Sequence, residues 1–171
     1  IRRSKTDICS IDVPHDEEYL ALVRDLLEHP KVGLMREYIQ HGDTTCLEHC
    51  VNVSYLVIFL QVARAAARGG LLHDLFLYDW HFYRRTKGER LHGFEHPRKA
   101  LKNAEEAFSL TAVERDIILR HMWPLTIVPP KYAESYVIVM YDKYCSTMET
   151  FRLPVMYLEA PALLPPRHVM P

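Results

Sequence analysis

The chain has 171 residues, and its 21 basic and 22 acidic side chains give a formal net charge of −1. A chain of this length fits one domain and can bury a core without disulfide staples. Electrostatic capture of a polyanion needs a basic excess, so the charge balance argues against a nucleic-acid polymer or a membrane surface as a partner. A small anionic substrate is compatible with this charge balance, because a few local cations suffice to bind it.

The cysteines lack the dense spacing of a secreted disulfide scaffold. Cys46 and Cys50 are spaced like zinc ligands on a helix, but we favour the interpretation that they are small core residues. The run Val51 to Ala67 is too short and too polar for a membrane span, and no signal-peptide pattern is present. We therefore expect a cytoplasmic protein. Because the sequence begins with Ile1 rather than Met, we expect the natural N-terminus to be missing.

Helical signals begin near the N-terminus, whereas alternating strand patterns hardly appear. Pro14 with its acidic neighbours predicts the start of a first helix, which should end at Pro30. A second, short helix is predicted from about Lys31 to Gln40, closed by Gly42, since glycine accepts the left-handed conformation after a helix end.

Three further helices are predicted from their start and stop signals. Thr45 and Glu48 form a capping-box pattern that opens one helix, with His49 in its first turn. Pro97 occupies a first helical position, which places His96 at the entrance of the next helix. A second capping-box pattern opens the third helix, and that helix should end near residue 121. These signals indicate helices separated by short loops.

A last long helix is predicted from about Ala133 to Phe151, followed by a proline-rich segment. The sequence therefore predicts an all-α, single-domain helical bundle. We assign residues 1–44 to N-terminal helices that pack on the core, residues 45–152 to the core itself, and residues 153–171 to a proline-rich C-terminal tail.

Imidazole and carboxylate groups recur in order along these helices. The stretch GGLLHDLFLYDWH places His73 and Asp74 among buried leucines, where an unpaired carboxylate would cost several kcal/mol or more. Asp142 also has apolar neighbours, so its carboxylate lies either inward and paired or on a narrow polar face beside Lys143. Imidazole and carboxylate are the ligand types that suit divalent iron, manganese, nickel, cobalt or zinc. The candidate metal ligands are His49, His73, Asp74, His96, His121 and Asp142.

This series resembles the HD superfamily of metal-dependent phosphohydrolases, which is named for a His-Asp pair like the one in LLHDLF. The resemblance extends over roughly Thr45 to Thr150 and includes the motifs GFEHP and LRHMWP. It implies an HD-domain fold with two metal ions. By motif order it assigns one ion to His49, His73, Asp74 and Asp142, and the other to Asp74, His96 and His121.

The resemblance also implies an activity. Two divalent ions of Fe, Mn, Ni, Co or Zn lower the pKa of a bridging water, and the resulting hydroxide attacks phosphorus. The expected function is hydrolysis of a phosphoester or phosphoanhydride bond, with a small phosphorylated substrate, a nucleotide, as the partner. Asp74 would act in catalysis as the bridge, and Lys143 would either contact a phosphate or face solvent. Two alternatives stay open: an HD-fold di-iron oxygenase, and a non-catalytic nucleotide sensor stabilised by metal.

The spacing of the first two ligands sets a condition on the fold. His49 and His73 are 24 residues apart, so one continuous helix would separate them by about 36 Å at about 1.5 Å per residue. The chain must therefore reverse between them, yet Ile58 to Val62 contains no turn-forming residue. We infer that the sequence omits a few residues between about Val57 and Ala65.

Overall fold

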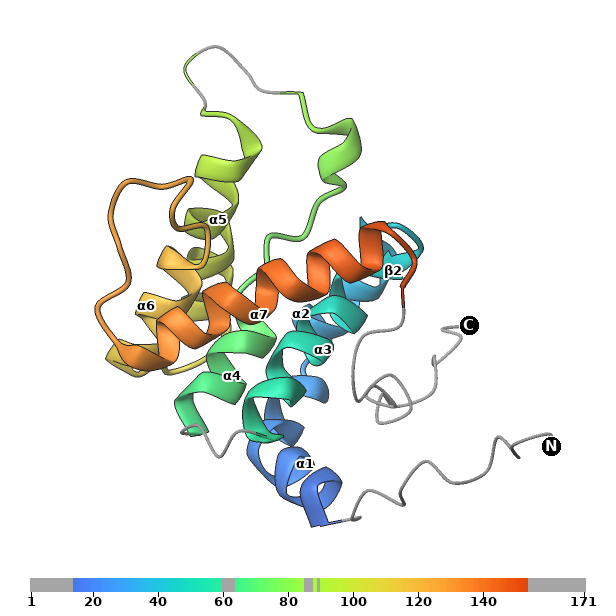
Figure 1. Ribbon diagram of the computed structural model, residues 1–171, viewed down its shortest axis with the longest axis vertical. Coiled ribbons are helices and arrows are strands. Elements are labelled where there is room, and N and C mark those ends of the chain that lie inside the picture. The colour runs from blue at the N-terminus through green and yellow to red at the C-terminus, as the bar shows by residue number, and fades with distance from the viewer. Residues whose placement is uncertain (1–13, 60–63, 85–87, 89, 154–171) are drawn as a thin grey trace, which may run out of the picture.

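The computed structural model describes residues 14–59, 64–84, 88 and 90–153. Within these residues the chain forms helices and one small antiparallel sheet (Figure 1). The elements are α1 (Pro14–Leu27), α2 (Pro30–Gly33), the 3-10 helix η1 (Leu34–Glu37), β1 (Ile39–His41), β2 (Thr44–Thr45), α3 (Cys46–Phe59), α4 (Arg64–Leu72), the 3-10 helix η2 (Trp80–Phe82), α5 (His92–Ala107), α6 (Ala112–Arg120) and α7 (Ala133–Thr150).

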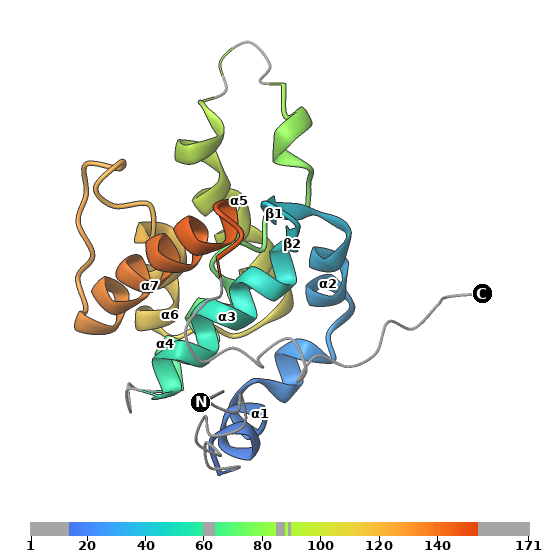
Figure 2. The same cartoon turned by 45° about the vertical axis from the view of Figure 1, so that its right-hand side comes forward.

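The helices pack into one compact bundle with α4 near its centre. Helix α4 contacts α1, α3 and α6, and α7 lies across α3 and α6 (Figures 1 and 2). Helix α5 packs mainly on α6. The predicted all-α single domain is therefore confirmed. Among the described residues, no helix combines the length and the apolarity that a membrane span requires.

The prediction of a helix over Lys31 to Gln40 is wrong beyond its first turns. Only α2 and η1 are helical there, and the chain then extends into β1, which pairs with β2. Gly42 forms the turn between the two strands at φ 56°, and a side chain on it would meet the backbone oxygen of Glu149 at 2.5 Å. Pairing with β2 satisfies the backbone groups that a longer helix would have used.

Both capping boxes are present as predicted. The Thr45 hydroxyl accepts a hydrogen bond from the Glu48 amide at 3.2 Å, and the Glu48 carboxylate accepts one from the Thr45 amide at 2.8 Å. Thr111 and Glu114 form the same reciprocal pair at the start of α6. Each pair satisfies two amides that a helix start leaves without partners. The box at Thr45 fixes where α3 begins and hence the position of His49.

The chain reverses between α3 and α4, as the ligand spacing requires. The two helices pack against each other, and the ring centroids of His49 and His73 lie 5.3 Å apart. Gly70 permits the close approach, because a side chain on it would meet the Cα of Ser54 at 3.2 Å. Residues 60–63, on which the inference of omitted residues falls, lie outside the described residues.

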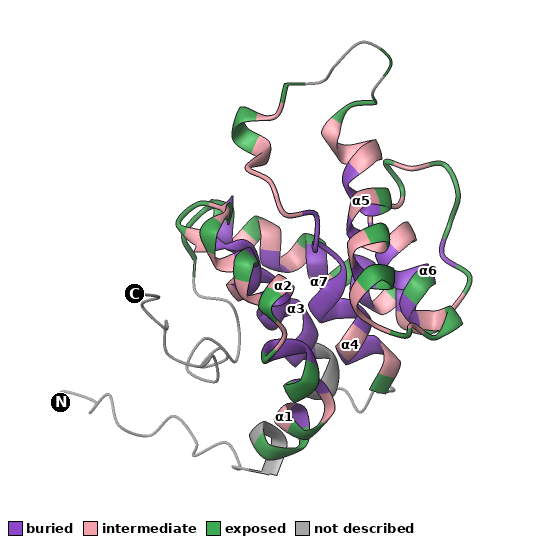
Figure 3. Ribbon diagram, turned by 180° about the vertical axis from the view of Figure 1, so that it is seen from behind, coloured by how far each residue is buried: buried purple, intermediate pink, exposed green. Residues whose placement is uncertain are grey.

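The buried side chains concentrate where α3, α4 and α7 meet (Figure 3). Tyr19 and Leu26 of α1 join the same apolar cluster. Three cysteines are buried free thiols, which agrees with their interpretation as core residues, and they are Cys46, Cys50 and Cys145. Several polar side chains are buried in the same region, including the imidazoles of the candidate site.

Candidate metal centre

Five segments of the chain bring the predicted ligands together, and all six side chains are buried. His49 lies in the first turn of α3, His96 in α5 and Asp142 in α7. We expected every ligand to lie within a helix or at its entrance. This is wrong for three of them: His73 and Asp74 follow the end of α4, and His121 follows the end of α6. Adjacent residues in a helix point about 100° apart. Leaving the helix lets His73 and Asp74 face the same point.

The first group of ligands surrounds Asp142. The Nε2 atoms of His49 and His73 lie 3.2 and 3.7 Å from Asp142 Oδ1, and His73 Nε2 lies 3.6 Å from Asp74 Oδ2. One donor atom each from His49, His73 and Asp74 falls within a span of 4.8 Å, which could hold a metal ion.

The second group lies on the other side of Asp74. Asp74 Oδ1 is 3.3 Å from His96 Nε2 and 3.4 Å from His121 Nε2, and the two Nε2 atoms are 2.8 Å apart. These three residues also place one donor atom each within 4.8 Å. Asp74 therefore belongs to both groups and presents one carboxylate oxygen to each.

Hydrogen bonds on the outer side of the rings fix which nitrogen faces the centre. A backbone carbonyl can only accept, so a ring nitrogen bonded to a carbonyl must carry the proton. The other nitrogen then faces inward, where it can bind a metal ion once it carries no proton, as metal-binding histidines do. Three rings donate from Nδ1 to a carbonyl of their own helical turn: His73 to Gly70 at 2.7 Å, His96 to His92 at 3.0 Å and His121 to Ile118 at 2.9 Å.

His49 is oriented by a carboxylate that the sequence analysis did not identify. Its Nδ1 lies 2.8 Å from Glu149 Oε2, and the Asn52 amide donates to Glu149 Oε1 at 2.9 Å. Glu149 is buried in α7. It follows Asp142 by seven residues, which is about two helical turns, so both face the same side. That spacing is a signal that could have identified it.

The centre contains polar atoms that only a cation or a proton can satisfy. With both Nδ1 atoms donating outward, the lone pairs of His96 and His121 face each other across 2.8 Å. His73 Nε2 and Asp74 Oδ1 are buried and have no hydrogen-bond partner among the described residues. A set of imidazole nitrogens and carboxylate oxygens suits divalent transition metals. The residues therefore fit metal ions in both groups.

The pKa shifts show how the first group balances its charges in the absence of ions. Burial alone raises the pKa of a carboxyl, but the neighbouring imidazoles outweigh burial and hold the pKa of Asp74 and Asp142 well below the usual range. Burial alone lowers the pKa of an imidazole, but neighbouring acidic groups raise the pKa of His49 and His73 well above the usual value. Burial dominates at His121 and lowers its pKa. Protons therefore bind the first group more readily than His121.

A pocket of about 250 Å³ opens over the two groups. Lys143 lies at this pocket with its side chain about half exposed, and its Nζ donates to the His121 carbonyl at 3.1 Å and lies 3.8 Å from Asp142 Oδ2. Gln40 lines the pocket and donates to Asp74 Oδ2. The sequence analysis placed Gln40 at a helix end and missed this contact. The pocket gives a small ligand access to the buried centre.

The helical fold and the two groups of buried His and Asp residues are compatible with an HD-type site. Comparison of the chain with protein-family models, with curated proteins and with solved structures found no significant match in any of the three. An assignment to the superfamily that the sequence resembles therefore depends on the residues of this chain alone.

Proposed function

We propose that this protein is a metal-dependent phosphohydrolase of the HD type, which cleaves a phosphoester or phosphoanhydride bond of a nucleotide. The observation that carries the proposal is the position of Asp74. Its Oδ2 lies 3.6 Å from His73 Nε2, and its Oδ1 lies 3.3 and 3.4 Å from the Nε2 atoms of His96 and His121. One carboxylate shared by two sets of nitrogen donors suits a pair of ions around a single reacting group.

The side chains of the pocket have separate tasks in this function. Divalent ions, when bound, make water acidic enough to attack near neutral pH and neutralise the phosphate oxygens. Asp74 would contribute a ligand to both ions, and Gln40 fixes the Asp74 carboxylate by donating a hydrogen bond to it. Lys143 Nζ lies at the pocket, where it can pair with a phosphate oxygen.

Two aromatic groups at the pocket support a planar substrate portion. The rings of Trp80 and His92 stack with centroids 5.4 Å apart, and both residues line the pocket. Burial, and next the charge of His96, lowers the pKa of His92 to about 4, so this ring is neutral at physiological pH. His81 also stacks on Trp80 and His96 on His92, so these rings would form an aromatic wall beside a nucleobase, and a neutral His92 does not repel nearby cations.

The test combines elemental analysis of the purified protein with a phosphate-release screen over a nucleotide panel. We expect bound Fe, Mn, Ni, Co or Zn and release from at least one nucleotide. Asp74→Asn keeps the size of the side chain but removes the shared charge, so activity should fall more than about 100-fold, beyond what loss of an outer partner costs. Asp43→Asn is the matched control at an exposed aspartate and should leave activity unchanged.

Three outcomes would contradict the proposal. Full activity of Asp74→Asn would place the reaction elsewhere. Tightly bound iron with oxygen consumption and no phosphate release would indicate an oxygenase. A nucleotide that stays bound for hours without product would indicate a sensor.

A further inference from the structure

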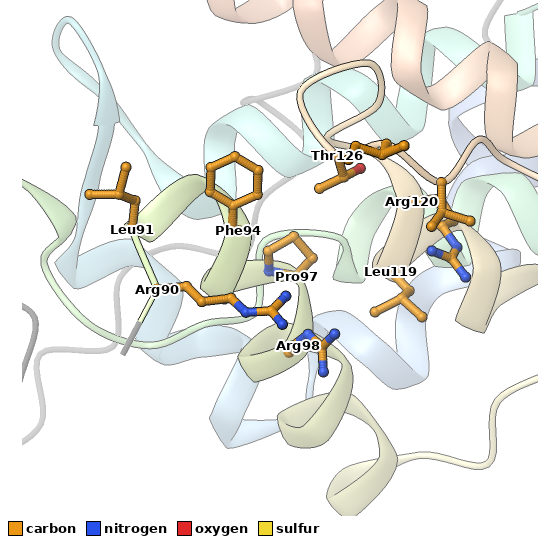
Figure 4. A pocket seen from close by; sticks show the side chains of 10 residues that line it. Arg90, Leu91, Phe94, Pro97, Arg98, Leu119, Arg120 and Thr126 are labelled. Atoms are coloured by element: carbon orange, nitrogen blue, oxygen red, sulfur yellow. The ribbon is translucent and has the colours of Figure 1, made fainter. Parts of the chain in front are cut away.

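A second cleft, larger than the pocket over the metal centre, lies on another face of α5. It has a volume of about 560 Å³ and is formed by the start of α5, the end of α6 and the segment that follows α6 (Figure 4). None of its lining residues lines the pocket over the metal centre. Three arginines and several apolar side chains surround it, among them Arg90, Arg98, Arg120, Phe94, Pro97 and Ile127.

Among the described residues, two of the three arginines of this cleft have no carboxylate partner, and the third has only a distant one. Arg90 and Arg98 are exposed and form no ion pair within the described part of the chain. Arg120 approaches Asp116 only at 4.0 Å, and its buried Nε atom has no hydrogen-bond partner among the described residues. In Figure 4 the side chains of Arg90 and Arg98 extend to the same edge of the cleft. Positive charges that neighbouring carboxylates neutralise only in part favour an anion between them.

A further polar atom and an apolar surface complete the cleft. The Thr126 hydroxyl lines it, and its oxygen is also buried without a partner among the described residues. Ile127 is 93 % exposed and Leu91 60 % exposed, which is unusual for such large apolar side chains. Phe94 and Pro97 extend this surface toward the arginines. Exposed apolar area beside convergent donors is typical of a ligand site.

We propose that this cleft binds a phosphorylated organic ligand at a site separate from the metal centre. The phosphate lies among the guanidinium groups of Arg90, Arg98 and Arg120, because a dianion with three acceptor oxygens matches several guanidinium donors better than a carboxylate does. The apolar or planar body of the ligand lies on Phe94 and Ile127. The inference depends on the cleft alone and goes beyond the proposed hydrolysis.

The cleft is lined by residues that are adjacent in sequence to ligands of the second metal group. Pro97 directly follows His96 in α5, and Arg120 directly precedes His121. Gly93 of α5 packs closely on the segment that follows α6, since a side chain on it would meet Leu125 Cδ2 at 2.8 Å. A phosphate held by arginines of both helices bridges α5 and α6 from the side opposite the imidazoles.

The test is calorimetric titration of the chelator-treated protein with 1-naphthyl phosphate, with inorganic phosphate and 1-naphthol as comparisons. Without metal ions the proposed hydrolysis cannot consume the probe. We expect 1-naphthyl phosphate to bind at least about tenfold more tightly than either comparison compound, since only it has both the charge and the apolar body. Arg90→Gln and Arg98→Gln should each weaken binding by about fivefold to tenfold, the loss typical of a charge-assisted hydrogen bond at an exposed site.

Arg24→Gln is the matched control, because Arg24 is an exposed arginine on α1, away from the cleft. It should bind the probe like the unaltered protein, and circular dichroism should show that all three variants fold. Equal affinity in all variants, absence of binding, or equal affinity for inorganic phosphate and 1-naphthyl phosphate would each overturn the proposal. These results are independent of phosphate release with metal present, so either proposal can fail without the other.

Discussion

The substitution Glu149→Gln tests how far the metal centre depends on a residue outside the two ligand groups. Glu149 accepts hydrogen bonds from His49 and Asn52 with its two oxygens. Glutamine has the same size but only one acceptor oxygen. It can therefore satisfy one of the two donors and must present its amide group to the other. The variant also loses the negative charge that raises the pKa of His49.

The expected loss follows from these contacts. Removing the partner of a metal-binding histidine typically weakens metal affinity by about 10–100-fold, or roughly 1.4–2.8 kcal/mol. Glu149 is only 6 % exposed, so water cannot easily replace the lost hydrogen bond. We therefore expect a loss near the upper end of this range in Glu149→Gln. The ligand atoms themselves are unchanged, so two ions should still bind at saturation.

The assay is competition for Mn²⁺ or Zn²⁺ against a chelator of known affinity at fixed pH, with the thermal midpoint of each ion-free protein as a check on folding. Glu28→Gln is the control, since Glu28 is exposed near the end of α1. If folded Glu149→Gln binds metal within twofold of the unaltered protein, the hydrogen bond to His49 does not support the ligand and the reasoning is wrong.

Three more predictions concern packing, metal removal and pH. Gly70→Ala should lower the free energy of unfolding in urea by about 1–2 kcal/mol, because the added Cβ would meet Ile138 and the backbone of Ser54. Gly33→Ala is the control: nothing lies within 4 Å of its added Cβ, so the free energy of unfolding should change by less than about 0.5 kcal/mol. Metal at 100 times its dissociation constant should stabilise the protein by about 2.7 kcal/mol, seen as a higher thermal midpoint that a chelator reverses. Metal affinity should rise with pH, because neighbouring acidic groups raise the pKa of His49 and His73 and protons therefore compete with metal for both rings. Titration in buffers of different ionisation enthalpy measures the protons that metal binding releases.

Local signals were sufficient for most of the fold. The capping boxes at Thr45 and Thr111 each satisfy amides within four residues, so they are visible in the sequence and present in the structure. The strands β1 and β2 have three and two residues, which is too short for an alternating pattern. Their pairing depends on the turn at Gly42 and on its contact with Glu149, which lies more than 100 residues away in the sequence. Such a contact leaves no local signal.

The sequence likewise identified one part of the candidate site and missed another. The six imidazole and carboxylate residues were identified because their types and order resemble a known series, and the structure brings them together. Gln40 and Asn52 were missed, since amides at a strand and in a helix have many ordinary roles. The cleft on α5 was missed because its arginines belong to different segments. Nothing in the sequence relates Arg90 to Arg120.

The two ligand groups should differ in how protons compete with metal. In the first group neighbouring acidic groups raise the pKa of His49 and His73, so protons compete with an ion there. In the second group burial lowers the pKa of His121, and its lone pair already faces that of His96. An ion that enters the second group therefore displaces fewer protons and relieves the contact between two lone pairs. It follows that the first equivalent of metal should bind at the second group with weak pH dependence, while the second equivalent carries most of the proton release. Equal proton release for both equivalents would show that the two groups do not differ in this way.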